Sequence, residues 1–236
     1  FLYFIALRAM QVDVHVSVSA PSQPLGGKAV TPADKGLQFK APSQLVDAGF
    51  PTAESTFALS SVIAPGTIND KYLQPAVAGV TTDRTNHVIF AYGQRYGPKR
   101  DQLFGANGFA AKLLAEVAKA AGSAPAGTQF QAVCFGVGVN ESLVDFIDAT
   151  NTDGVILETA HESPKPTKLE APVLRSPADA QKVAKAIADN VAAHFADVAA
   201  PPTTPEGQAL PPYIGTSVVL AVYRFDDGAS FGNGTE

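Results

Sequence analysis

Residues 101–138 read DQLFGANGFAAKLLAEVAKAAGSAPAGTQFQAVCFGVG, and this stretch predicts a helix followed directly by a strand. Apolar residues recur on one face of the Ala-rich segment 101–121, and Gly122 stands where a helix would end. Residues 129–138 then form an apolar run, which is typical of a buried strand. The pair of elements indicates a chain that mixes α and β structure.

Strand patterns also lie on the N-terminal side of this stretch. Residues 87–93 form a short apolar run that predicts another strand. Four valines between residues 12 and 18 alternate with polar residues, the two-residue period of a half-buried strand. Between Pro21 and Pro75 prolines and glycines interrupt the chain often, so the segment 21–75 is predicted to be rich in loops.

A second long helix is predicted on the C-terminal side. Ser176 is a favourable N-cap and Pro177 suits the first helical position. Val183, Ile187 and Val191 then recur every four residues, which predicts one buried face.

The fold class that follows is α+β, with mixed strands, two long Ala-rich helices and long Pro/Gly-rich loops over 21–75 and 201–212. A short helix over 143–149 and strands over 155–159 and 217–223 complete the predicted elements. The elements do not alternate regularly enough to predict a doubly wound sheet.

Residue 1 is Phe rather than Met, and the apolar run 1–7 begins without a cap or a polar lead-in. We therefore expect residues 1–236 to be a single domain or a fragment of a larger structural protein. A signal peptide requires a basic region before its apolar residues, and here no such region is present. No window of the sequence reaches the ~18 apolar residues of a membrane span. We expect no membrane partner.

The charge balance argues against a nucleic-acid-binding protein. The chain has 17 basic and 22 acidic residues, so its net charge is −5, and we expect weak or no direct nucleic-acid binding. The densest basic and aromatic spot is 92–100, which could be a contact patch or a solvated loop before a helix.

Phosphate-binding motifs are incomplete. Gly105 and Gly108 precede a helix and Gly136 and Gly138 end a strand, but neither pair completes G-x-G-x-x-G, and G-x-x-x-x-G-K-[ST] does not occur. The first two glycines predict instead that the regular helix starts near Phe109.

No catalytic, cofactor-binding or metal-binding residue is identified, and no cofactor is expected. Cys134, the single cysteine, lies in an apolar strand and is predicted to be a buried, inert thiol. The four histidines, at positions 15, 87, 161 and 194, leave a Ser-His-Asp triad open, because its members meet only in the fold. Asp226 and Asp227 precede a glycine. This pattern could bind a hard cation, but it is first of all typical of a turn.

The run Phe1–Ala20, an apolar segment that passes into an alternating valine strand, resembles a segment of the capsid proteins of totivirus-like double-stranded RNA viruses of fungi. The order that follows is also similar: strand 87–93, a loop with basic residues, helix 101–121, strand 129–138 and a late strand over 216–225. The resemblance is one of element order across most of the chain and includes no diagnostic motif.

This resemblance implies a structural subunit of an icosahedral capsid that assembles through loops and apolar strands. Its partners would be copies of itself or other capsid subunits, and its location would be the virion, assembled in the host cytoplasm. The alternative is a small soluble α/β enzyme, a hydrolase or transferase, with a site near the ends of strands 87–93 and 129–138. Tyr92, Asn107, Gly138 and Asn140 would line its pocket.

Overall fold

The computed structural model divides the chain into two compact units, Phe1–Lys71 and Tyr72–Glu236. It describes residues 15–17, 30–33, 36–39, 55–58, 61–63, 68–85, 87, 89, 99–138, 143–157, 165–196 and 217–231.

Short strands make up most of the described part of the first unit. β1 (His15–Ser17) pairs in parallel with β5 (Ser61–Ile63). A separate antiparallel sheet has the order β2-β3-β4 and consists of Val30–Ala33, Gly36–Phe39 and Ser55–Ala58. β1 lies within the segment where the alternating valines predict a strand.

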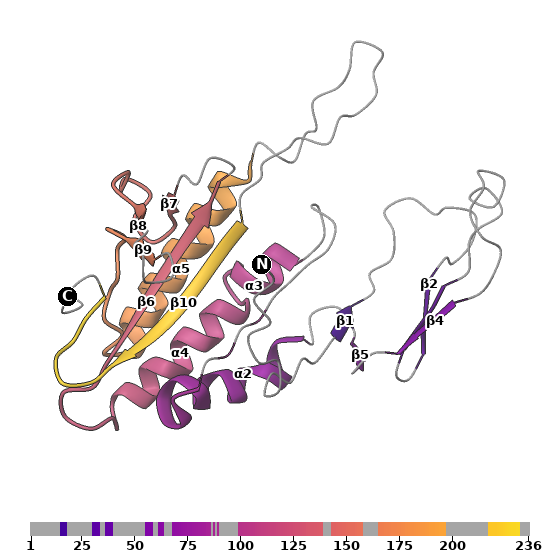
Figure 1. The fold of residues 1–236 in the computed structure, drawn as a ribbon, viewed down its shortest axis with the longest axis horizontal. Helices are drawn as coiled ribbons and strands as arrows, with labels where there is room; N and C mark the ends of the chain where they lie inside the picture. Colours follow the sequence, from indigo (N-terminus) through magenta and orange to yellow (C-terminus); the bar gives the residue numbers. More distant parts are fainter. Residues whose placement is uncertain are drawn as a thin grey trace, which may run out of the picture. The chain divides into compact units, whose positions relative to one another are not determined.

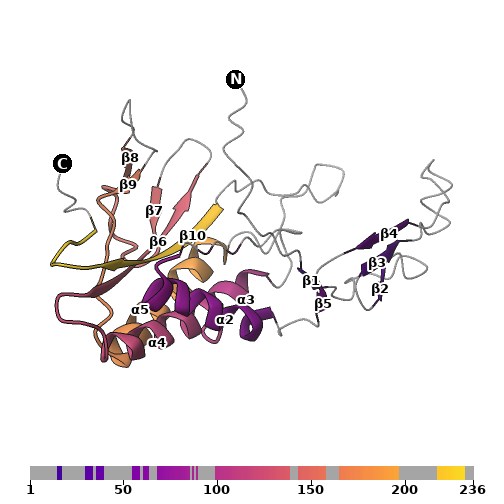
Figure 2. The same ribbon diagram turned by 60° about the horizontal axis from the view of Figure 1, so that its bottom comes forward.

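The second unit contains the helices. They are α2 (Ile68–Ala78, which begins in the first unit), the π-helix η2 (Gly79–Asp83), α3 (Lys99–Phe104), α4 (Phe109–Ala121) and α5 (Pro177–His194). α4 and α5 pack against each other and lie on one side of the sheet (Figure 1, Figure 2). Within the described residues, no helix is both long and apolar enough to cross a membrane.

The main sheet of this unit has the order β10-β6-β7. β10 (Ser217–Phe225) runs antiparallel along the whole length of β6 (Gln129–Val137), while β7 (Leu143–Asp145) pairs only with the last residues of β6. A separate hairpin joins β8 (Val155–Leu157) to β9 (Lys165–Thr167).

β6 is the centre of the hydrophobic core, because every residue from Phe130 to Gly136 is buried. Alternate residues face opposite sides of the sheet. On the helical side, Phe130 joins a cluster that includes Leu114 of α4 and Ile187 of α5. On the other side, Val133 and Phe135 form a second cluster with Leu169.

The structure confirms the mixed α and β character, with a few helices and small, mostly antiparallel sheets, as α+β requires. The predicted strands over 129–138, 155–159 and 217–223 correspond to β6, β8 and β10. The second long helix begins as predicted, since Asp179 N–H donates to the Ser176 hydroxyl at 3.3 Å.

Two predicted helices differ from the structure. The helix over 101–121 is divided into α3 and α4 at residues 105–108, and the regular helix starts at Phe109 as the glycines predict. The short helix predicted over 143–149 is wrong: residues 143–145 form β7, because Leu143, Val144 and Asp145 pair with the end of β6. Of the strand predicted over 87–93, only His87 and Ile89 are described, and they lie in neither helix nor strand.

Candidate functional site

Charged side chains join the end of β10 to the turn that follows α2. Asp226 Oδ1 accepts hydrogen bonds from Thr128 Oγ1 at 2.8 Å and from Arg224 Nε at 3.2 Å, and Asp226 Oδ2 lies 3.0 Å from Arg84 Nη2. The Arg224 guanidinium also donates to the Thr81 carbonyl oxygen. We call Arg84, Thr128, Arg224 and Asp226 the Asp226 cluster.

The Asp226 cluster keeps its carboxylate charged. The hydrogen bond from Thr128 is the largest cause of a lowered pKa at Asp226; partial desolvation opposes it, and Arg224 and Arg84 lower the pKa further. Because two guanidinium groups already surround this carboxylate, it is not open to a cation. Asp227 and Gly228 have positive φ angles of 60° and 81°, as a turn at this position requires.

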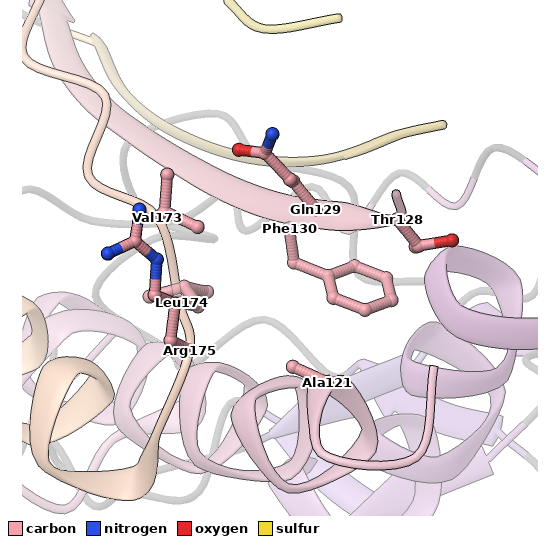
Figure 3. Close-up of a pocket in the computed structure, with 7 residues that line it drawn as sticks. All are labelled: Ala121, Thr128, Gln129, Phe130, Val173, Leu174 and Arg175. Atoms are coloured by element: carbon pink, nitrogen blue, oxygen red, sulfur yellow. The ribbon is translucent and has the colours of Figure 1, made fainter. Parts of the chain in front are cut away.

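A small cavity opens beside the start of β6, with a volume of about 160 Å³. Figure 3 shows the Phe130 ring lying between the strand and Ala121 of α4, whereas the Gln129 side chain extends from the other side of the strand. Arg175 and Val173 border the cavity from the segment that precedes α5. Pockets for metabolites or drug-sized ligands usually have volumes of about 300–1,000 Å³, so this cavity is too small for such a ligand.

A buried carboxylate organises the turn after β7. Asp145 Oδ1 accepts the N–H groups of Ile147 at 2.8 Å and Asp148 at 3.1 Å, and Oδ2 accepts from the Asn151 amide at 2.9 Å and the Glu170 N–H at 2.7 Å. The side chain is almost fully buried, with 2% of its residue surface exposed. With four donors on its two oxygens, Asp145 stabilises the fold and has no free position for a substrate.

Cys134 is buried in β6, and desolvation together with the nearby Asp145 charge raises the pKa of its thiol far above the ordinary value. This confirms the predicted burial of the thiol, and the raised pKa disfavours the thiolate, which is the nucleophilic form.

Contacts are known for two of the described histidines, His194 and His87. The His194 ring packs edge-on against Phe146 and Phe195, with ring centroids 5.4 Å and 4.9 Å away, and His87 Nε2 lies 3.1 Å from Thr85 Oγ1. Among the described residues, no group of three His, Cys, Asp or Glu side chains could hold a metal ion. His161 lies outside those residues.

The pocket expected for a small enzyme is not supported. Asn107 is exposed between α3 and α4, and Gly138 follows β6, while Tyr92 and Asn140 lie outside the described residues. The cavity in Figure 3 lies at the first residues of β6, the opposite end of the strand from Gly138.

The basic segment 92–100 is described only from Lys99, where α3 begins. Arg100 is exposed there, and its Nε lies 3.0 Å from Asp101 Oδ1. One cation of the predicted contact patch is therefore paired with a neighbouring carboxylate.

No protein-family model matches the sequence, and no curated protein matches it. Solved structures do match in fold. The motor domain of a Kar3-like kinesin from Ashbya gossypii aligns with a TM-score of 0.56 at 15% identity, over 73% of this chain and 57% of that chain. A fast kinesin, described with its ATPase mechanism and interactions with microtubules, aligns with a TM-score of 0.61 at 15% identity, over 91% of this chain and 60% of that chain.

The chain thus has a kinesin-like fold and spans somewhat more than half the length of these neighbours. This finding overturns the resemblance to totivirus-like capsid proteins, together with the capsid-subunit function and the virion location that it implied. The resemblance rested on the order of strands and helices alone, and such an order is shared by unrelated folds.

The segment 93–100 contains a signal that a search for complete motifs misses. It reads Gly-Gln-Arg-Tyr-Gly-Pro-Lys-Arg. Gly93 and Lys99 have the spacing of the first glycine and the lysine in G-x-x-x-x-G-K-[ST], whereas Pro98 and Arg100 replace the second glycine and the hydroxyl residue. The segment leads into α3, but the structure shows no strand before it at the described residues His87 and Ile89, so the motif spacing alone marks it. A search that tolerates two substitutions would have found it.

Proposed function

We propose that this chain is part of a motor-type domain of kinesin-like fold that does not hydrolyse ATP and acts instead as a binding module. The fold likeness supports the motor-type class. We infer the loss of ATP hydrolysis from the segment between Gly93 and Arg100, which departs from the phosphate-binding motif at two positions.

The chemistry of the loop explains why its two substitutions matter. In P-loop ATPases, backbone N–H groups cradle the phosphates, the lysine reaches the β- and γ-phosphates, and the Ser or Thr hydroxyl holds Mg²⁺. Pro98 has no N–H to donate and restricts the backbone, and Arg100 has no oxygen with which to ligate Mg²⁺. Lys99 alone retains its place in the motif.

One structural neighbour is described with interactions with microtubules, so microtubules are the polymer to test. Because the loop is altered, we expect any such binding to be independent of nucleotide, unlike that of a motor driven by ATP.

The test measures phosphate release and nucleotide binding with the full 236-residue chain. We expect no release of phosphate from Mg·ATP above the buffer rate, with or without microtubules. The double variant Pro98→Gly/Arg100→Thr restores the motif and is expected to gain binding of a fluorescent ATP analogue. The triple variant that adds Lys99→Ala is the matched control and is expected to lose that gain.

Co-sedimentation with microtubules tests the binding role separately. We expect the same bound fraction without nucleotide, with ADP and with ATP. The proposal is wrong if the natural sequence hydrolyses ATP and Lys99→Ala abolishes that activity, if none of the chain co-sediments with microtubules, or if the bound fraction changes with the nucleotide.

A further inference from the structure

The end of α2 has an unusual geometry. α2 continues into the five-residue π-helix η2, in which the Arg84 N–H donates to the Gly79 carbonyl oxygen five residues earlier. Arg84 itself lies in the left-handed region at φ 53°. π-helical turns are rare and are widened relative to an α-helix, so a particular set of contacts is needed to hold one.

The required contacts come from the end of β10. The Arg224 guanidinium donates to the Thr81 carbonyl oxygen inside η2, and these two residues are 143 positions apart in the sequence. Arg84, the residue that follows η2, forms an ion pair with Asp226, in which Arg84 Nη2 lies 3.0 Å from Asp226 Oδ2. Both arginines thus connect the wide turn to one carboxylate.

The chain that leaves η2 is also held in place. The Thr85 N–H donates to the Gly79 carbonyl oxygen at 3.1 Å. A Cβ added to Gly79 would lie 2.1 Å from His87 Cδ2 and 3.0 Å from the Thr85 carbonyl oxygen, so the returning chain packs directly on this glycine. The positions of Thr85 and His87 therefore depend on the π-helical turn.

We infer that Arg84, Arg224 and Asp226 form a clasp that keeps the end of α2 in its π-helical register and so holds Thr85 and His87 against Gly79. In the α-helical register each carbonyl oxygen would accept from the residue four positions later, and Arg84 would rotate about the helix axis by about 100°. It would then no longer reach Asp226. The clasp makes the wide turn the more stable of the two helical registers. This inference does not depend on the absence of ATP hydrolysis.

Hydrogen exchange of the Arg84 amide reports the register directly, because this amide donates the π-type bond. In Asp226→Asn we expect the Arg84 and Thr85 amides to exchange about tenfold faster, since the charged partner of both arginines is removed. Asp227→Asn is the matched control, because it changes the adjacent exposed carboxylate outside the clasp, and we expect no change.

A second variant distinguishes a local effect on the π-helical turn from a loss of stability of the whole fold. Arg84→Gln removes a side chain that is 68% exposed, so it leaves no cavity, and we expect the same local acceleration. Protection of the Val133 amide in β6 against exchange reports the stability of the whole fold. If Asp226→Asn lowers this protection, the exchange of residues 84 and 85 in Arg84→Gln is the result that tests the inference. The inference is overturned if Arg84→Gln exchanges like the natural sequence at residues 84 and 85, or if Asp227→Asn accelerates exchange as much as Asp226→Asn.

Discussion

Asp145 and Glu170 are joined across 25 residues of sequence, because Oδ2 of the Asp145 carboxylate accepts the Glu170 backbone N–H at 2.7 Å. The same carboxylate accepts three further donors in the turn after β7. One buried side chain therefore connects this turn to the segment that precedes α5.

Replacing Asp145 with Ala should lower the free energy of unfolding by about 3 kcal/mol, because several buried donors lose their acceptor. Urea denaturation measures the change. Asp153→Ala, at an exposed position in the same region, is the control and should change the stability by less than about 0.5 kcal/mol. Equal stability of the two variants would contradict the role assigned to Asp145.

Ser176→Ala should lower the free energy of unfolding by about 1 kcal/mol, because the N-cap of α5 loses the bond from the Asp179 N–H. Ser176→Thr keeps a hydroxyl acceptor and should recover most of that loss. Thermal unfolding followed by circular dichroism compares the three proteins, and a Thr variant as unstable as the Ala variant would rule out a capping role.

The Asp226 cluster should make stability depend on acid. Thr128, Arg224 and Arg84 face this carboxylate and lower its pKa, so the folded state holds the charged form more tightly than the unfolded chain does. The contribution is complete above the unfolded pKa of about 3.9 and is lost as the pH falls through the lower folded pKa. The stability difference between the natural sequence and Asp226→Asn should be constant from about pH 5 to 8 and disappear in stronger acid. A difference that grows on acidification would contradict this assignment.

Cys134 should be unreactive in the folded protein. Burial raises the pKa of its thiol, so the thiolate is scarcely populated at pH 8. We expect no reaction with a thiol-specific chromogenic disulfide in buffer and one equivalent of reaction in denaturant. Rapid reaction of the folded chain would show that the strand opens locally.

The elements that the sequence predicts best are those whose signals are local. α5 has a capping serine and a four-residue apolar period, and β6 and β10 are continuous apolar runs. The sequence does not predict α2, because Pro75 lies inside this helix and proline ordinarily indicates a break. The helix predicted over 143–149 is wrong because pairing of Leu143–Asp145 with β6, a tertiary contact, determines the strand and the local sequence period does not.

The candidate sites depend even more on contacts between distant segments. The Arg224–Thr81 bond joins residues 143 positions apart, and no motif or spacing predicts it. The segment 93–100 shares Gly93 and Lys99 with the phosphate-binding motif but departs from it at Pro98 and Arg100, so the complete motif does not identify it.

The burial of β6 on both faces has an evolutionary consequence. From Phe130 to Gly136 there is no exposed position at which a polar residue could accumulate without cost. Selection on this strand therefore acts on apolar character and volume, while the identity of each side chain is free to drift among similar residues. Such a strand tolerates large changes of sequence within one fold, and the two kinesin motor-domain structures that match this chain in fold share only 15% of its residues.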